Sequence, residues 1–530
     1  MPVNKTAIPN ADFPEQVGIS SYELTPFLND FRVNKIELHS LMLIRNGKVA
    51  FETHSLPYGR YVRQAMFSVG KAFVAAAIGF AQEEGLLSLN SKVIDFFPEY
   101  RPPKRDKYLE RLTIRHLLTM TAAKKVAPVS PRSAEARLKS FFTAKWTGEP
   151  GKTVEYCAEN VCICCDILRQ VTGTGLTEYL TPRLYGPLGY ETPPQWEKDT
   201  TGIEGGYWGI YLSPDELARF SMCLLNNGVY NGKQILPQKF AEEMLTIQSK
   251  AIPFQNKKGE TDYSYFIRSG NLRHSFMIDG TFSQFAVMAK DYDAILVCTC
   301  SHFAPQETRD VIFRHFHRIL VNCKDAPVQE DFSLSLPPVP IICANRQRET
   351  EEELRGTVLQ FRNNAVLSAI GVPCSILPLA NIYLAPNKGN NINNMVLDFS
   401  ADTCLMSWDE GKDHNMIHLA MDGSLRYDKM TISGFDYNIV CAAAWKSERV
   451  LEIQVRPLES INERRIILEF GLKKNVTMLS ESTTATRMLG DELGNIAAEF
   501  FESEGISKPL NSLVSNFSYI INSPIKGKIN

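Results

Sequence analysis

Residues 66–85 read MFSVGKAFVAAAIGFAQEEG, an apolar segment that carries a hydroxyl and an amine near its start. Ala, Phe, Val and Ile would occupy nearly every side of a helix here, which is typical of a buried helix, and Gly85 offers a left-handed stop. Ser68 and Lys71 are three residues apart, so they share one face of the first turn. The segment predicts an internal helix that begins with these two groups within reach of each other.

The Ser68–Lys71 pair is a candidate nucleophile with its activator. A serine hydroxyl attacks only when a base takes its proton, and a lysine can be that base when burial or neighbouring groups displace its own proton. The helix N-terminus would stabilise an oxyanion at Ser68. The same motif also describes an N-cap serine followed by a lysine that reaches solvent, so the motif alone leaves both interpretations open.

Composition excludes several classes of protein. The 530 residues are 44% apolar, which predicts two to four domains with real cores. The 57 basic and 59 acidic residues create no field for a polyanion, so nucleic acid is not an expected partner. No signal peptide is recognisable and the longest apolar run is far below the ~20 residues that span a bilayer. We expect a soluble, cytoplasmic protein without a membrane partner.

Twelve cysteines in a chain without an export signal indicate reduced, buried thiols. Cys157, Cys162, Cys164 and Cys165 lack the paired spacing of zinc ligands, so we expect them to pack on a helix. No metal and no cofactor are predicted.

The first 325 residues alternate between helical and strand patterns. Residues 41–44 and 49–51 flank Asn46-Gly47, a strong hairpin signal. Residues 161–171 form an apolar helix that follows Tyr156, and Ser213-Pro214 begins another helix. Residues 285–288 and 294–298 predict adjacent antiparallel strands, with Asp279-Gly280-Thr281 at the start of the first. A helix over 306–322 should pack back on this sheet.

The remainder of the chain has a different composition. We assign residues 1–330 to one domain, 331–354 to a linker rich in proline and charge, and 355–530 to a β-rich domain. Short strand-like runs recur in it, and Asp422-Gly423 predicts a hairpin turn between two of them. Their spacing suits a β-sandwich or a small barrel. No catalytic signature occurs there.

With Ser68, Lys71, Tyr156 and Asp279-Gly280-Thr281 in this order, the first ~325 residues resemble the serine β-lactamase and penicillin-binding protein superfamily. They are most similar to class C β-lactamases, related esterases and 6-aminohexanoate-dimer hydrolases. Further segments also fall in the family's order, among them residues 84–89, 96–99, 113–120, 171–173 and 187–189. The resemblance implies an α/β (α+β) domain with a five-stranded antiparallel sheet flanked by helices, a helical lobe, and an active site between them.

The resemblance also implies roles for individual residues. Ser68 is the expected nucleophile, Lys71 its proton partner and Tyr156 a phenolic acid/base that passes the proton to the leaving group. The backbone N–H groups of Ser68 and Thr281 are the expected oxyanion hole, which typically contributes on the order of 3 kcal/mol per donor. The implied activity is hydrolysis of an ester or amide through an acyl-enzyme.

Two departures from the family pattern bear on the substrate. Where Tyr-x-Asn is usual, the chain has Tyr156-Cys157-Ala158, so Asn160 is the candidate replacement for the missing amide. Where Lys-Thr-Gly is usual, it has Ile278-Asp279-Gly280, so the cation that engages a β-lactam carboxylate is absent; Arg268, Arg273 and His274 are nearby candidates. We take Asn160, Asp279 and Gly280 as substrate-binding candidates.

These departures favour an esterase, amidase or peptidase over an efficient β-lactamase. The expected partner is a small-molecule ester, amide or peptide whose identity the sequence does not encode, and homo-oligomerisation stays open. The alternative is a binding or sensing module on the same scaffold with little or no turnover. A cell-wall peptidase would require export, and the missing signal peptide argues against it.

Overall fold

The computed structural model describes residues 7–124, 134–199, 201–206, 209–250, 261–302, 304–322, 334–362, 373–378, 381, 389–471, 474–482 and 524–530. Contacts within the chain divide it into two compact units, the first ending at Leu336 and the second beginning at Pro337. Residues 331–333, part of the expected linker, lie outside the described residues.

The first unit is built on one antiparallel sheet of six strands in the order β2-β1-β10-β9-β8-β7. Its strands are β1 (Glu37–Arg45), β2 (Lys48–His54), β7 (Arg268–Ser269), β8 (Ser275–Gly280), β9 (Gln284–Ala289) and β10 (Ala294–Ser301). Five of them are long, as expected, and the two-residue β7 adds a sixth at the edge. The hairpin between β1 and β2 turns at Asn46 and Gly47, both with positive φ, as the Asn-Gly signal predicts.

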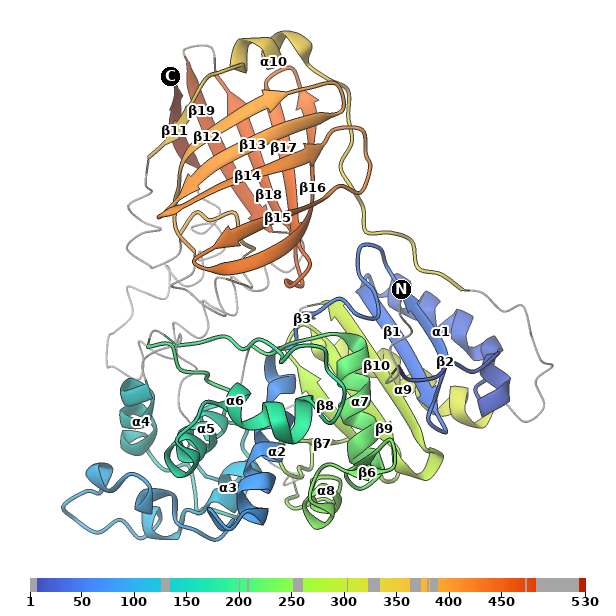
Figure 1. The fold of residues 1–530 in the computed structure, drawn as a ribbon, viewed down its shortest axis with the longest axis vertical. Coiled ribbons are helices and arrows are strands. Elements are labelled where there is room, and N and C mark those ends of the chain that lie inside the picture. The colour runs from blue at the N-terminus through green and yellow to red at the C-terminus, as the bar shows by residue number, and fades with distance from the viewer. Residues whose placement is uncertain are drawn as a thin grey trace. The chain divides into compact units, whose positions relative to one another are not determined.

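Helices cover both faces of this sheet (Figure 1). On one face, α1 (Ser21–Val33) and α9 (Pro305–Val321) share a core with Leu41, Val287 and Leu296. The opposite face contributes Met42, Ile295 and other alternating side chains to a second, larger core. This alternation follows from the two-residue period of a strand, and it confirms the layered fold expected for the first unit.

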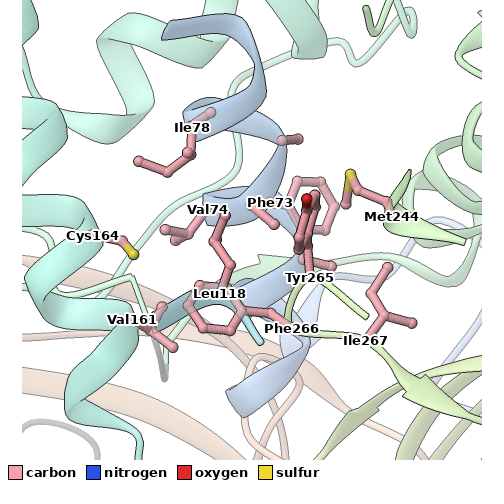
Figure 2. Packing of buried hydrophobic residues seen from close by; sticks show 14 of the residues in the cluster. Phe73, Val74, Ile78, Leu118, Val161, Cys164, Met244, Tyr265, Phe266 and Ile267 are labelled. Carbon is pink, nitrogen blue, oxygen red and sulfur yellow. The ribbon is translucent and has the colours of Figure 1, made fainter. Parts of the chain in front are cut away.

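The larger core surrounds α2 (Gly70–Glu83), the predicted central helix. Residues 70–81 of α2 are all buried, and Gly85 has the expected positive φ of 72°. Figure 2 shows Phe73, Val74 and Ile78 of α2 between side chains of α5 on one side and those of Met244 and residues 265–267 on the other. The helix is therefore internal, and its first turn is positioned by packing in every direction.

Further helices and four two-residue strands complete the described part of the first unit. They are α3 (Ile114–Leu118), α4 (Ala134–Thr143), α5 (Glu159–Thr172), α6 (Leu176–Leu180), α7 (Pro214–Leu225), α8 (Gln238–Met244) and the two-residue strands β3 (Gln64–Ala65), β4 (Tyr211–Leu212), β5 (Val229–Tyr230) and β6 (Lys233–Gln234). Helix α7 begins with the predicted cap, since Ser213 and Glu216 exchange hydrogen bonds. Helix α5 ends at Gly173, which has a left-handed conformation.

The second unit is a ten-stranded sheet that closes on itself. The strands are β11 (Leu359–Phe361), β12 (Ile392–Phe399), β13 (Thr403–Glu410), β14 (Asp413–Ala420), β15 (Tyr427–Ile432), β16 (Phe435–Ser447), β17 (Val450–Pro457), β18 (Arg464–Phe470), β19 (Asn475–Ser482) and β20 (Ile525–Ile529). A parallel bridge from Ala420 of the end strand β14 to Ala442 of β16, the strand next to the other end, closes the sheet. Of the two expected architectures, the barrel is therefore the one observed (Figure 1).

Three expectations about connections are corrected by the structure. Asp279-Gly280 ends β8 and does not begin the following strand. Asp422-Gly423 does not close a hairpin, because β14 pairs in a ladder with β13 whereas β15 pairs with β16. Part of the expected linker is folded: α10 (Arg348–Leu354) belongs to the second unit, where the Trp445 indole donates a 2.9 Å hydrogen bond to Glu351.

Among the helices of the described residues, none combines the length and apolar character that a membrane span requires.

Candidate active site

Ser68 lies in a one-turn 3-10 helix (Phe67–Val69) that leads directly into α2. The backbone is fixed on both sides of it: the Met66 N–H donates to the Ile210 carbonyl at 2.8 Å, and Gly70 lies so close to Trp196 that a Cβ would overlap the ring. Phe67 has a φ of 50°, a left-handed conformation that costs an ordinary residue about 1–2 kcal/mol. Strain of this kind is common next to functional residues.

Lys71 follows one turn later and is almost completely buried, with 2% of its side chain exposed. Its Nζ donates to the Tyr156 hydroxyl at 3.4 Å and lies 3.8 Å from Oδ1 of Asp279. An amine buried in this way costs free energy unless polar partners compensate for its lost hydration. Tyr156 and Asp279 are those partners.

Tyr156 connects the two groups at the start of α2. Its hydroxyl lies 3.0 Å from Ser68 Oγ and 3.4 Å from Lys71 Nζ. The residue precedes α5 by a short turn and keeps 37% of its surface exposed. The structure therefore brings together the three residues expected to carry catalysis, and the junction between them is accessible to solvent. Their catalytic roles stay predictions.

The end of β8 packs against the Ser68 turn. A Cβ at Gly280 would overlap the Met66 carbonyl oxygen, so only glycine permits this approach. Phe282, just beyond Thr281, packs its ring on Phe67 with the centroids 5.0 Å apart. Gly280 and Phe282, the neighbours of Thr281, thus pack against the turn that carries Ser68. The expected part of Thr281 in an oxyanion hole stays a prediction.

Asp279 lies between two cations. Its Oδ2 forms an ion pair with Nε of Arg268 at 3.0 Å, and its Oδ1 faces Lys71. Burial alone would raise the pKa of this carboxyl, but the charges of Arg268, Lys71 and Arg309 outweigh burial and hold the pKa below its ordinary value. Burial likewise opposes the charge of Arg268, yet Asp279 raises the pKa of that guanidinium above its usual range.

Asn160, the proposed replacement for the missing amide, is fully buried in the first turn of α5. Its Nδ2 contacts Met120 Sδ at 3.6 Å, and its Oδ1 has no hydrogen-bond partner among the described residues. No hydrogen bond in this part of the chain joins Asn160 to Ser68, Lys71 or Tyr156. Its role in binding substrate stays a prediction.

Several other cysteine and histidine side chains of the first unit pack or form hydrogen bonds within the fold. Cys162, Cys164 and Cys165 are buried in α5 as expected, and burial raises the pKa of each thiol. His116 accepts a hydrogen bond from the Thr113 N–H and so helps to cap α3. His274 pairs with Asp291 on the exposed β9–β10 turn. Within the described residues, no group of three potential ligands is placed to hold a metal ion.

Sequence reasoning missed part of the electrostatic surroundings. The sequence suggests Arg268 only as a substitute for a missing lysine, whereas the structure pairs it with Asp279 and places its guanidinium 4.9 Å from the centre of the Tyr263 ring. Arg309 of α9 lies near Arg268. Burial and the positive charge of Arg268 together lower the pKa of Arg309. Neither contact has a local sequence signal, because each depends on the register of distant elements.

The chain is 25% identical over 200 residues to an uncharacterised protein of Alkalihalophilus pseudofirmus, covering 34% of this chain and 54% of the relative. It is 29% identical over 135 residues to a D-aminopeptidase of Brucella anthropi, covering 24% of this chain and 26% of the relative. The chain thus matches about half and about a quarter of the lengths of these curated relatives.

Among solved structures, the octameric penicillin-binding protein homologue of Pyrococcus abyssi shares 15% identity, with 87% of this chain and 98% of that chain covered at a TM-score of 0.44. The β-lactamase family model matches residues 37–316, from the first strand of the sheet to α9. This span is more than half of the sequence and includes every residue of the site described above. The chain belongs to the β-lactamase family.

Proposed function

We propose that the first unit is a serine hydrolase that cleaves an ester or amide bond through an acyl-enzyme on Ser68. The observation that carries this proposal is the contact series from Ser68 Oγ to Tyr156 Oη at 3.0 Å and on to Lys71 Nζ at 3.4 Å. A hydroxyl hydrogen-bonded to a group that can take its proton is the arrangement that nucleophilic catalysis requires. Family membership supports the same reaction.

The reaction proceeds in two halves. The Ser68 hydroxyl loses its proton to the Tyr156–Lys71 pair as Oγ bonds to the substrate carbonyl carbon. The oxygen of that carbonyl becomes an oxyanion and accepts hydrogen bonds from the backbone N–H groups of Ser68 and Thr281. The proton then moves to the leaving alcohol or amine as its bond to carbon breaks. Water attacks the acyl-enzyme by the same route and restores the Ser68 hydroxyl.

The charges near the site favour simple esters and amides over β-lactams. Asp279 occupies the segment in which the family usually has Lys-Thr-Gly, and both of its oxygens face cations of the chain itself. No cation precedes it, since residue 278 is isoleucine. Arg268 is committed to Asp279 and is a poor substitute for a lysine that must bind a substrate carboxylate.

The test is a substrate panel on the full chain. We would assay p-nitrophenyl acetate and butyrate, D-alanine p-nitroanilide, which the D-aminopeptidase relative suggests, and nitrocefin as the β-lactam. We expect turnover of at least one ester or anilide and little of nitrocefin. Ser68→Ala should lower kcat/KM by at least about 10³-fold, whereas Ser88→Ala, an exposed serine beyond α2, should match the wild type.

The alternative function, a binding or sensing module, predicts a different result. A fluorescent penicillin or a fluorophosphonate would still modify Ser68, because attack requires only the activated hydroxyl. None of the panel would then turn over beyond one equivalent per chain. Turnover that persists in Ser68→Ala would contradict both functions.

A further inference from the structure

Asp279 has an arrangement that substrate binding does not explain. It is the penultimate residue of β8, where it pairs with Phe285 of β9, and only 19% of its side chain is exposed. Its two oxygens face two different cations, Arg268 at 3.0 Å and Lys71 at 3.8 Å. A carboxylate engaged in this way is oriented toward the protein, so little of it is available to a ligand.

The surroundings of this carboxylate are cationic. Arg268 comes from β7, Lys71 from α2 and Arg309 from α9, and together their charges favour the ionised form of Asp279. Three further titratable groups act on these cations: Tyr263 lies against Arg268, Tyr156 presents its ring to both Arg268 and Lys71, and Asp310 acts on Arg309. Asp279 is therefore the carboxylate that faces both Arg268 and Lys71.

The contacts of Lys71 matter for the order of proton transfer. Among the described residues, Ser68 Oγ is hydrogen-bonded to Tyr156 and has no such bond with Lys71. An ammonium group has no free electron pair, so it cannot accept the serine proton. The Asp279 carboxylate, 3.8 Å from Nζ, attracts a positive charge at that position.

We propose that Asp279, oriented by Arg268, is a positioning residue that keeps Lys71 charged, so that the Tyr156 oxygen takes the proton of Ser68. This inference rests on the proposed function. The charged Lys71 stabilises the Tyr156 phenolate before the Ser68 proton is transferred, and it donates a hydrogen bond to the Tyr156 phenol afterwards. In the opposite arrangement, a neutral Lys71 would itself be the base and Asp279 would hinder the reaction.

The test is the pH dependence of kcat/KM for the best ester of the panel, in the wild type and in Asp279→Asn. We expect the alkaline limb to move to lower pH by about one unit, because an amine without its carboxylate loses its proton more easily. Arg268→Gln should not move that limb to lower pH, since it leaves the negative charge beside Lys71. Asp291→Asn, an exposed acid on the β9–β10 turn, should reproduce the wild-type profile.

Other profiles overturn the inference. An acidic limb that moves to lower pH in Asp279→Asn, with faster hydrolysis at neutral pH, would show that Lys71 acts as the base. A profile of unchanged shape but reduced height would show that Asp279 has only a structural role. If the wild type hydrolyses the ester and Ser68→Ala does not, either of these profiles rejects only the role of Asp279. If neither protein hydrolyses any ester or amide, both the proposed function and the role of Asp279 are rejected.

A second measurement covers the case in which Asp279→Asn does not fold. The wild-type chain labelled with ¹³Cε-lysine gives an NMR signal for Lys71, assigned by its loss in Lys71→Arg. We expect the chemical shift of a charged amine across the pH range in which the enzyme is active. The shift of a neutral amine in that range would contradict the inference.

Discussion

Lys71 and Lys124 are two lysines of the first unit with the same exposure, 2%, and different surroundings. The Nζ of Lys124 donates to the carbonyl oxygens of Ala144 and Phe142 at 2.8 and 3.3 Å and lies 4.1 Å from the centre of the Trp146 ring. Burial lowers the pKa of Lys124 to about 8, although Asp106 and Cys157 act in the opposite direction. Carbonyls and an indole ring cannot exchange a proton with the amine.

Lys71 faces a phenol that also contacts a serine, and a carboxylate that is itself paired. Burial alone therefore does not distinguish these two amines, whereas their polar neighbours do. The groups that share its proton decide whether a buried lysine stabilises the fold or takes part in a reaction.

The sharpest test of this difference replaces each lysine with methionine, which keeps the length of the side chain. Lys71→Met should lower kcat/KM for an ester substrate about 10³–10⁴-fold, because the Tyr156 phenolate loses its cation. Lys124→Met should stay within about threefold of the wild type. Steady-state kinetics on both variants decides the question, and equal losses would mean that the two lysines do not differ in function.

Tyr156→Phe isolates the phenol hydroxyl while keeping the ring that faces Lys71 and Arg268. Removing the group that receives the proton should lower kcat about 10²–10³-fold with little change in KM. Tyr61→Phe, at a tyrosine with 62% exposure, is the matched control. A loss confined to KM would instead assign Tyr156 to substrate binding.

Two acids of the first unit, Asp279 and Glu159, differ in the same way as the two lysines. Cations hold the pKa of Asp279 low, whereas burial raises the pKa of Glu159 to about 7. Because the folded state of Glu159 binds its proton more tightly than the unfolded chain, stability from this group falls as pH rises from about 4.5 to 7, by on the order of 3 kcal/mol. Glu159→Gln should be more stable than the wild type at pH 8.5 and equal to it at pH 4. Denaturant unfolding at both pH values measures this difference in the free energy of unfolding. The same difference between the two proteins at pH 4 and at pH 8.5 would refute the prediction.

Lys124 has the opposite pH dependence. Its folded pKa of about 8 lies below the ordinary 10.5, so the unfolded chain binds more protons between these values and stability rises with pH. The expected gain between pH 8 and 9.5 is about 2 kcal/mol. Denaturant unfolding of Lys124→Met across this range should lack the gain. A gain that persists in the variant would have another origin.

Local patterns predicted the elements that place Ser68 and its neighbours. The apolar run before Gly85 identified α2, Asn46-Gly47 identified the first hairpin, and Ser213 with Glu216 identified the cap of α7. Each depends on residues within a few positions of one another. The grouping of Tyr156 with Ser68 came from the family resemblance, since 88 positions separate them.

What the sequence did not predict depends on long-range register. Arg268 reaches Asp279 because β7 pairs with β8, and Arg309 joins them from α9. In the second unit, the long strand β16 was not expected, and the bridge from Ala420 to Ala442 decides between barrel and sandwich. An alternating pattern shows that a strand has a buried face but not which strand lies beside it.

The central claim is that Ser68 is the nucleophile, and covalent labelling followed by peptide mapping tests it most directly. The folded full-length chain would be treated with a fluorophosphonate at neutral pH and digested, and the modified residue would be identified by tandem mass spectrometry. We predict a single phosphonylated residue, Ser68, with no adduct in Ser68→Ala and slower labelling in Lys71→Met. An adduct on a different serine, or none on the folded wild-type chain, would contradict this account.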